Sequence, residues 1–597
     1  MTTSIVTESP LANLRLNLVD SIDRAMEFKR WIGERHGSDV LGLDTETGGL
    51  RPEHDHLRMV QFGDLQTGWA IPWELWGGVA LEILRDYRGA YVLHNSSFDY
   101  RFLTTRAGWD GPWDRTDDTY TEAHLVDPGR PKGLKPLASR LVDPRAMAGQ
   151  ELLDRAMREN GWDWGTVPWN FPWYWMYAAL DPVLTCHIHD RLKPKVSALG
   201  SQNAYALEMS AVRICSGMML RGIRIDTEYC IRHIGELRTK VQEIRSWVQN
   251  AYGIENMTSN RQVTDRLEKD GVELWKRTKS GSAWALDKEV LEWLADALQH
   301  PLAQYVQFVR KAEKICGSYL DHFVQWTDQY GFVHANVNPL GAITSRMSIT
   351  GPAFQTLFRE AKPSRIVRGC VIPREGNVLI STDMDQIEAR LMAIYSQDQG
   401  LLDAFNTDKD FFCEIATQLW KEEIKKGDHR RTLIKNVIYG KDYGAGPETM
   451  AKTAGVPEAI MLPLVESFDV RFPGVRRFFN SVLTVGRQLE RAEGVGYVVT
   501  PYGRRIPNVD GRLYALTNYL IQGAAAEILK KSLADLDAVG LGEYLILPVH
   551  DEILLDVPKE IVPDVLRIMK ETLNDYTSFP VPLTWSTEVF EERWGPK

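Results

Sequence analysis

The chain has 597 residues, of which 44% are hydrophobic, and a formal net charge of −10 at pH 7. This length predicts roughly four domains, and the composition supplies enough apolar residues for several cores. The six cysteines are scattered and include no C-x-x-C pair, which argues against a disulfide framework and a zinc site. The sequence shows no signal-peptide pattern and no long apolar run, which argues against secretion and a membrane span. We therefore expect a cytoplasmic protein.

The N-terminal third alternates strand-like and helical patterns and carries four spaced carboxylates. Asp44 and Glu46 are two residues apart in a strand-like run, which places both side chains on one face. Asp99 supplies a third acid, and Tyr177 and Asp181 are one helical turn apart. Four acids and a phenol fit a pair of metal ions that activate water against a phosphodiester, with the phenol orienting the water. Each motif alone is weak, since D-x-E occurs by chance and a lone Asp often caps a helix.

The region from about 205 to 330 is mostly helical, and basic residues gather between Lys276 and Lys314 and again between Lys421 and Lys435. The net negative charge is unexpected for a protein that binds nucleic acid, so phosphate contacts must be concentrated locally. A charge run is usually a solvated face, but we interpret these two as phosphate contacts.

Two further acids end apolar, strand-like runs in the C-terminal half. Asp383 follows the run NVLIST, and Asp551 and Glu552 follow EYLILPV, within a predicted hairpin. Carboxylates that converge at strand ends repel one another unless a divalent cation lies between them. The alternative for each is an ordinary helix N-cap.

A helical segment between these acids carries Arg431, Lys435, Tyr439 and Tyr443 at every fourth position. This spacing places all four side chains on one stripe of a helix. Two cations followed by two aromatic rings suit a triphosphate at one end and a base with its sugar at the other. The alternative is a solvated basic turn that continues into a packed aromatic face.

The order of acid, basic-aromatic helix and acid resembles the A, B and C motifs of family A (polymerase I-like) DNA polymerases, from about residue 205 to the C-terminus. The N-terminal acids with Tyr177 resemble the DEDDy class of 3′→5′ exonucleases, the proofreading domain of many family A members. The resemblance implies an α/β multidomain fold, in which an RNase H-like exonuclease domain precedes a right-hand polymerase. The implied parts are the exonuclease (1–200), a helical thumb (201–330), an antiparallel-sheet palm (331–400 and 501–597) and helical fingers (401–500).

The resemblance also implies the reactions. A template-directed polymerase would extend DNA by one nucleotide from each dNTP with release of diphosphate, and the exonuclease would proofread. Two Mg²⁺ ions would act at each site, and Mn²⁺ could substitute. The implied polymerase ligands are Asp383, the carbonyl of Met384 and Asp551, with Glu552 assisting. The implied exonuclease ligands are Asp44, Glu46, Asp99 and Asp181, with Tyr177 as a further catalytic residue.

The residues implied to bind the incoming nucleotide are Met384, Gln386, Glu388, Arg431, Lys435, Tyr439 and Tyr443. Arg431 and Lys435 would bind the triphosphate, and Lys435 would also be catalytic. Glu388 would exclude a ribose 2′-hydroxyl, with Tyr443 packed beside it. Tyr439 would stack on the nucleotide. Many members have Phe there, and the hydroxyl could replace the hydrogen bond that a chain terminator lacks, which predicts that dideoxynucleotides are accepted.

Several segments resemble the DNA contacts of the family. Arg346, within the stretch TSRMS, and Gln355 would read the minor groove near the primer terminus, and His550 would contact the primer end. The segment TPYGRR, which contains Arg504, would contact the template together with Asn518 and Gln522. The alternative for each is an ordinary polar surface residue.

Three segments depart from the family pattern. Met384-Asp385 replaces Tyr-Ser, Phe412 replaces a His that would contact phosphate, and Pro548 lies inside the strand before His550, where proline favours an edge or a bulge. None of these departures removes a metal ligand.

The expected partners are primer–template DNA and dNTPs, with other replisome proteins such as a helicase-primase and a single-strand binding protein as further candidates, and we expect a monomer. The position of Asp44 near the start leaves no room for a preceding 5′→3′ nuclease domain, which suggests a bacteriophage replicative enzyme acting in the host cytoplasm. Two alternatives are an exonuclease with a degenerate DNA-holding module and a non-catalytic single-strand binder. The intact Asp383, Lys435 and Asp551 argue against the first, and the many metal-competent acids against the second.

Overall fold

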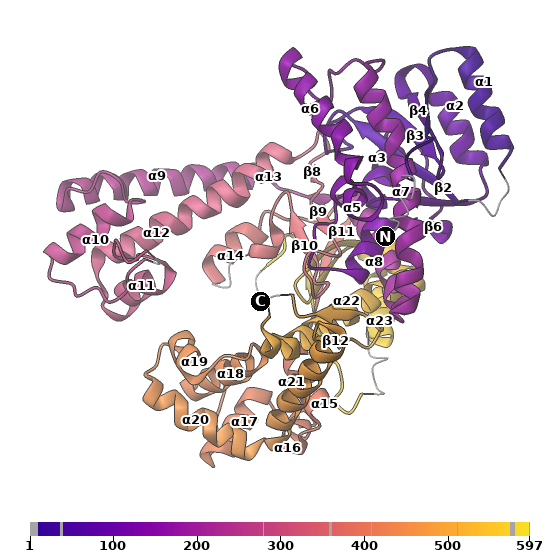
Figure 1. The fold of residues 1–597 in the computed structure, drawn as a ribbon. Helices are drawn as coiled ribbons and strands as arrows, with labels where there is room; N and C mark the ends of the chain where they lie inside the picture. Colours follow the sequence, from indigo (N-terminus) through magenta and orange to yellow (C-terminus); the bar gives the residue numbers. More distant parts are fainter. Residues whose placement is uncertain are drawn as a thin grey trace, which may run out of the picture.

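The computed structural model describes residues 10–35, 40–278, 280–357, 361–407, 409–509, 511–573 and 579–595. An N-terminal α/β part lies against a larger part, from which a helical arm and a helical lobe project on the same side (Figure 1).

The N-terminal part is built on a six-stranded sheet in the order β1-β4-β3-β2-β5-β6. Its strands are β1 (Arg15–Leu18), β2 (Val40–Thr47), β3 (Leu57–Gly63), β4 (Thr67–Pro72), β5 (Ala90–Leu93) and β6 (Thr116–Asp118). Its helices are α1 (Ile22–Gly33), α2 (Trp73–Asp86), α3 (Ser96–Ala107), α4 (Thr119–Val126), α5 (Leu134–Leu141), α6 (Ala148–Asn160) and α7 (Pro172–Ala198).

Both faces of this sheet are covered by helices. Alternate strand residues such as Leu43 and Val60 pack with the core residues of α1 and α2, whereas Met59 packs with those of α7. The helix α7 approaches the sheet closely because Gly42 and Gly68 face it. A Cβ at Gly68 would clash with a backbone carbonyl oxygen of α7.

The arm contains α9 (Thr227–Tyr252), α10 (Asn260–Lys269), α11 (Lys288–Glu292) and α12 (Pro301–Ile315) around a core of its own (Figure 1). It is joined to the body through α8 (Gln202–Arg221), α13 (Asp321–Trp326) and the two-stranded pair β7 (Ile223–Arg224) and β8 (Phe332–Val333).

The body centres on an antiparallel sheet in the order β14-β15-β11-β16. Its strands are β11 (Asn377–Met384), β14 (Leu545–Val549), β15 (Glu552–Pro558) and β16 (Trp585–Phe590). The helices α14 (Ala361–Arg368), α15 (Ile387–Ser396), α22 (Leu516–Leu536) and α23 (Val562–Leu573) and the pairs β9 (Asn336–Asn338) with β10 (Ser348–Thr350) and β12 (Tyr497–Val499) with β13 (Arg505–Pro507) complete it. β14 and β15 form the predicted hairpin. Pro548 is tolerated because β14 is an edge strand with a register shift.

The lobe contains α16 (Gln399–Phe405), α17 (Phe411–Trp420), α18 (His429–Asp442), α19 (Pro447–Ala454), α20 (Glu458–Arg471) and α21 (Pro473–Glu493). One hydrophobic core runs from the antiparallel sheet into this lobe, so the two are packed as one body. Within the described ranges, no helix combines the length and the apolar character that crossing a bilayer requires.

Candidate active sites

Three carboxylates of the N-terminal part converge where α7 crosses β2. Asp44 and Glu46 lie on the same face of β2 as Gly42, which is the face that α7 approaches. Potential ligand oxygens of Asp44, Glu46 and Asp181 all lie within 4.8 Å of one another. The close packing of a helix on a glycine-lined strand therefore brings together acids 135 or more positions apart.

Asp99 and Tyr177 lie beside this group. Asp99, in the first turn of α3, is buried and accepts a 2.7 Å hydrogen bond from the hydroxyl of Thr45. Burial raises the pKa of the Tyr177 phenol, and the negative charges of Glu46 and Asp44 raise it further. The structure thus places all five residues that the sequence predicted in one region, with Asp99 outside the tightest trio.

Burial also governs the charge of the acids. It raises the pKa of Asp44 to about 7. It raises the pKa values of Glu46 and Asp99 well above their usual range, and the neighbouring charge of Asp44 adds to both shifts. Carboxyl groups that hold protons in the absence of a metal ion are expected to release those protons to the solvent when a metal ion binds them. An all-oxygen set of this kind fits a hard divalent cation such as Mg²⁺.

The site contains one lysine that the sequence analysis did not identify. Lys135, in the first turn of α5, forms a buried ion pair with Asp181, and its Nζ lies 4.0 Å from the centre of the Tyr177 ring. Burial lowers the pKa of Lys135 to about 7, although Asp44 and Glu46 favour its charged form. In the sequence it is an ordinary polar position between leucines, so no local signal marks it.

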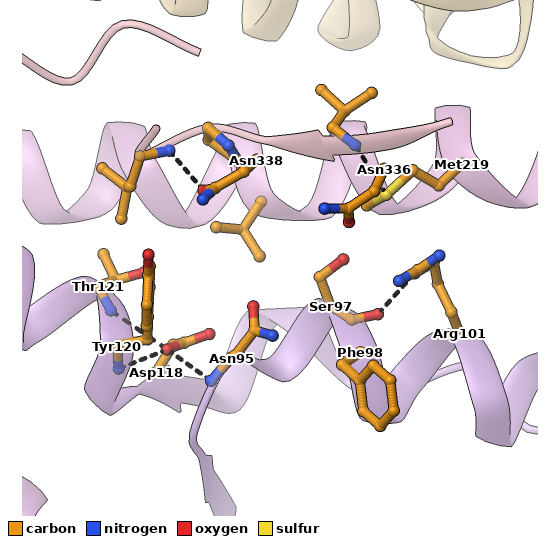
Figure 2. A pocket seen from close by; sticks show the side chains of 14 residues that line it. Asn95, Ser97, Phe98, Arg101, Asp118, Tyr120, Thr121, Met219, Asn336 and Asn338 are labelled. Carbon is orange, nitrogen blue, oxygen red and sulfur yellow. Dashed lines mark hydrogen bonds between the residues drawn. The ribbon is translucent and has the colours of Figure 1, made fainter. Parts of the chain in front are cut away.

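A cavity of about 130 Å³ opens next to the helix that carries Asp99. Figure 2 shows Ser97 and Arg101 of α3 on one side and Asn336 and Asn338 of β9 on the other. The hydroxyl oxygen of Ser97 is buried there without a hydrogen-bond partner. The two parts of the protein therefore leave a polar gap beside the N-terminal site.

The second pair of acids meets at one end of the antiparallel sheet. Asp383 lies near the end of β11, and Asp551 lies in the two-residue turn between β14 and β15, where the backbone N–H of Met384 donates to the Asp551 carbonyl at 3.1 Å. Burial raises the pKa of Asp551 to about 6. The charge of Arg346 opposes this rise, and the charges of Glu388 and Asp383 support it. The two carboxylates are thus close enough to repel, which fits a site for divalent cations.

Glu552 shares a sheet face with Asp383, since the two residues are paired across β15 and β11. The residue is 6% exposed, and its carboxylate accepts hydrogen bonds from Ser381, from Arg368 at 3.1 Å and from the indole of Trp594 at 3.2 Å. These three donors hold the carboxylate on the interior side of Asp383 and Asp551.

The basic-aromatic stripe lies on α18. Arg431 donates two hydrogen bonds, of 2.9 and 2.8 Å, to Asp410, which caps α17. Phe412 packs beneath the stripe, 5.3 Å from the Arg431 guanidinium and 6.0 Å from the Tyr439 ring. Lys435 Nζ lies 5.9 Å from that same ring. Phe412, which stands where the family pattern has His, therefore fills the space between the cationic and the aromatic ends of the stripe.

Tyr443, the last residue of the stripe, is the half-exposed C-cap of α18. Glu388, in the first turn of α15, forms an ion pair with Arg346. Burial disfavours the charge of Arg346, but Glu388, Asp551 and Tyr443 together raise its pKa. Arg346 therefore links the expected nucleotide-binding residues Glu388 and Tyr443 to the expected metal ligand Asp551.

Two of the expected DNA contacts lie beside Asp551. His550 occupies the hairpin turn with a φ of 56°, in the left-handed region, and its Nδ1 is 3.3 Å from the amide nitrogen of Gln355. The amide oxygens of Gln355 and Gln386 are both buried without a hydrogen-bond partner. Unpaired buried amides are costly, so these groups are suited to a polar ligand.

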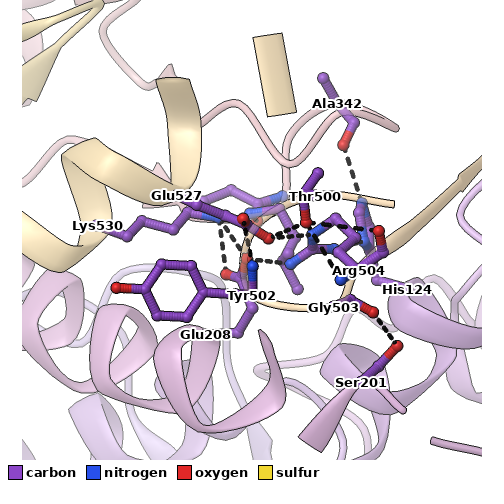
Figure 3. A network of polar contacts seen from close by, with 12 residues as sticks. His124, Ser201, Glu208, Ala342, Thr500, Tyr502, Gly503, Arg504, Glu527 and Lys530 are labelled. Carbon is purple, nitrogen blue, oxygen red and sulfur yellow. Dashed lines mark hydrogen bonds and ion pairs between the residues drawn. The ribbon is translucent and has the colours of Figure 1, made fainter. Parts of the chain in front are cut away.

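Arg504 does not lie where the sequence analysis expected it. It is 1% exposed and belongs to a buried network in which it contacts Glu208 and donates to Nδ1 of His124 at 3.1 Å (Figure 3). Lys530 reaches the same Glu208 at 2.6 Å. The expectation that Arg504 contacts template DNA does not agree with this burial, because its guanidinium joins the N-terminal part to the body. Asn518 is also mostly buried and Gln522 is half-buried, both on α22.

Comparison with known proteins gives consistent matches. A family described as "DNA polymerase family A" matches residues 227–595, and one described as "3'-5' exonuclease" matches residues 19–197. The DNA polymerases of Mycobacterium phages D29 and L5 are each 30% identical to this chain, over 97% of its length and 96% of theirs. A solved structure, the "POL domain of Pol1 from M. smegmatis complex with DNA primer-template and dNTP", is similar in fold, with a TM-score of 0.79, 23% identity and coverage of 95% of this chain and 98% of the other.

Proposed function

Because the chain belongs to DNA polymerase family A and carries a 3′-5′ exonuclease domain, we propose that it is a bacteriophage-type replicative polymerase that proofreads its own product. It is a DNA-directed DNA polymerase with exonuclease activity, and both of its domain families depend on metal ions. Two of its relatives, which match almost the whole of this chain over almost the whole of their own length, are DNA polymerases of phages.

The observation that carries the assignment of the polymerase site is the meeting of Asp383 and Asp551 at one end of the sheet. These acids, with the carbonyl of Met384, would hold two Mg²⁺ ions, for which Mn²⁺ could substitute. Bound there, the ions would activate the primer 3′-hydroxyl and neutralise the triphosphate and the leaving diphosphate. Glu552 supports the pair from the interior.

The side chains around this pair would orient the substrates. Arg431 and Lys435 bind the triphosphate of the dNTP, for which Arg431 exchanges its contact with Asp410 for phosphate. Tyr439 stacks on the nucleotide, and Glu388 blocks a ribose 2′-hydroxyl while it holds Arg346. Gln355 and His550, which contact each other, would contact the primer end of a primer–template duplex, and Asn518 and Gln522 would contact the template.

At the exonuclease site, Asp44, Glu46, Asp99 and Asp181 would hold two further Mg²⁺ ions, and Tyr177 would orient the attacking water. The parts would be the exonuclease (1–200), thumb (201–330), palm (331–400 and 501–597) and fingers (401–500). The chain would work as a monomer on primed DNA, beside a helicase-primase and a single-strand binding protein.

A primer-extension gel with and without dNTPs tests these assignments. The protein should lengthen the primer with dNTPs and shorten it without them. Asp383→Ala and Asp551→Ala should each abolish extension and leave shortening intact, whereas the double variant Asp44→Ala/Glu46→Ala should do the reverse. Loss of both activities in either set would contradict separate sites.

A further inference from the structure

Lys135 is a buried cation inside the acid cluster of the exonuclease site. Its side chain is 5% exposed, and the Asp181 carboxylate with which it pairs is 6% exposed. The ammonium also favours the ionised forms of Asp44 and Glu46, so its charge acts on all three acids of the closest trio. An ammonium this well buried is stable only where neighbouring negative charges compensate the loss of water.

The fold fixes the position of this lysine. Leu137 and Ala138 of α5 are fully buried in one hydrophobic cluster with Leu184 and Ile188 of α7. Lys135 lies three residues before Ala138 and so on the same side of α5, and the packing of α5 on α7 directs its side chain toward Asp181. The aromatic face of Tyr177, 4.0 Å from Nζ, gives the ammonium a further favourable contact.

A divalent cation and this ammonium require the same carboxylate. Asp181 is one of three residues whose oxygens can converge on one ion, and Lys135 already occupies an oxygen of Asp181. Positive charges a few ångströms apart repel strongly at a buried site. Binding of a metal to Asp181 must therefore overcome the ammonium, which either leaves this carboxylate or stays beside the ion at a cost in repulsion.

We propose that Lys135 is an internal counterion of the exonuclease site, which holds Asp181 in the metal-free enzyme and competes with the metal for it. The inference rests on the proposed metal ligands and makes Lys135 a positioning residue. It predicts that removal of the ammonium tightens metal binding, whereas loss of a purely structural residue would weaken it.

The test measures Mn²⁺ affinity by calorimetry or electron paramagnetic resonance, in the full chain with Asp383→Ala/Asp551→Ala so that the polymerase site does not contribute. Lys135→Met, which keeps the length and removes the charge, should bind Mn²⁺ at least about tenfold more tightly than its parent, because the repulsion is lost. Lys135→Arg, which keeps the charge, should bind Mn²⁺ with an affinity close to that of the parent. Lys132→Met is the matched control, since Lys132 donates to the carbonyl of Pro128 at 3.1 Å.

Thermal unfolding provides a second readout. Lys135→Met should melt lower than its parent in EDTA, and Mn²⁺ should raise its melting temperature by more than it raises that of the parent. Equal or weaker Mn²⁺ binding by Lys135→Met, or by Lys135→Gln if the methionine variant does not fold, would overturn the proposal. If Asp44→Ala/Glu46→Ala leaves Mn²⁺ binding unchanged in the same background, the proposed metal site itself fails.

Discussion

Tyr439 is the first aromatic residue of the α18 stripe, with Lys435 and Phe412 about 6 Å from its ring. This placement suits a phenol that contacts the sugar of the incoming nucleotide. Tyr439→Phe removes one hydroxyl and keeps the ring, so it should lower the use of dideoxynucleotides relative to dNTPs by roughly tenfold, the effect of one good hydrogen bond. Ratios of kcat/KM for the two nucleotide types measure this effect, and the value for dNTPs serves as the control. Equal ratios in both proteins would refute it.

At the residue scale, the sequence predicts the groups that lie on regular spacings and misses those that depend on packing. Asp44, Glu46 and Asp181 could be predicted because strand and helix periods place them on common faces. Lys135 could not, since only the docking of α5 on α7 brings it to the acids. Arg504 belongs to a motif that resembles a template contact, but a motif does not reveal that its guanidinium is buried against α8.

At the scale of elements, the contact between α7 and the sheet determines whether the exonuclease acids meet. Gly68→Ala would place a methyl group against the carbonyl oxygen of Ala179 and force α7 outward. We expect a destabilisation of about 1–3 kcal/mol, as for other overpacked cores, and at least a tenfold loss of exonuclease activity with primer extension retained. Gly78→Ala, on an exposed part of α2 where a methyl group meets nothing within 4 Å, is the control. Full exonuclease activity in Gly68→Ala would show that the site does not depend on this contact between α7 and the sheet.

Elements with a strong local signal were predicted correctly. The hairpin of β14 and β15 and the helix of the basic-aromatic stripe are present, and the fold class and the family are confirmed. The close approach of α7 was not predicted, because a glycine in a strand indicates only that something packs closely and does not identify what.

At the scale of the whole molecule, the exonuclease domain is joined to the polymerase through His124, which is 1% exposed (Figure 3). Nδ1 of His124 accepts from Arg504, so the ring proton must lie on Nε2, which donates to the carbonyl of Ala342 at 2.9 Å. This arrangement requires a neutral ring. Such a connection between domains could not be predicted, since its partners are distant in the sequence and carry no common pattern.

Acid should therefore weaken this junction. Burial, together with the charge of Arg504, holds the pKa of His124 well below its ordinary 6.5, whereas the unfolded chain protonates near that value. The contribution of a neutral His124 is thus complete above pH 6.5 and is lost as the pH falls below it, by about 1.4 kcal/mol per pH unit for one proton. His124→Gln can make both hydrogen bonds without titrating. Its urea midpoint should fall less between pH 7.5 and 5.5 than that of the parent. Equal falls in both proteins would show that the pKa of His124 does not differ between the folded and the unfolded chain.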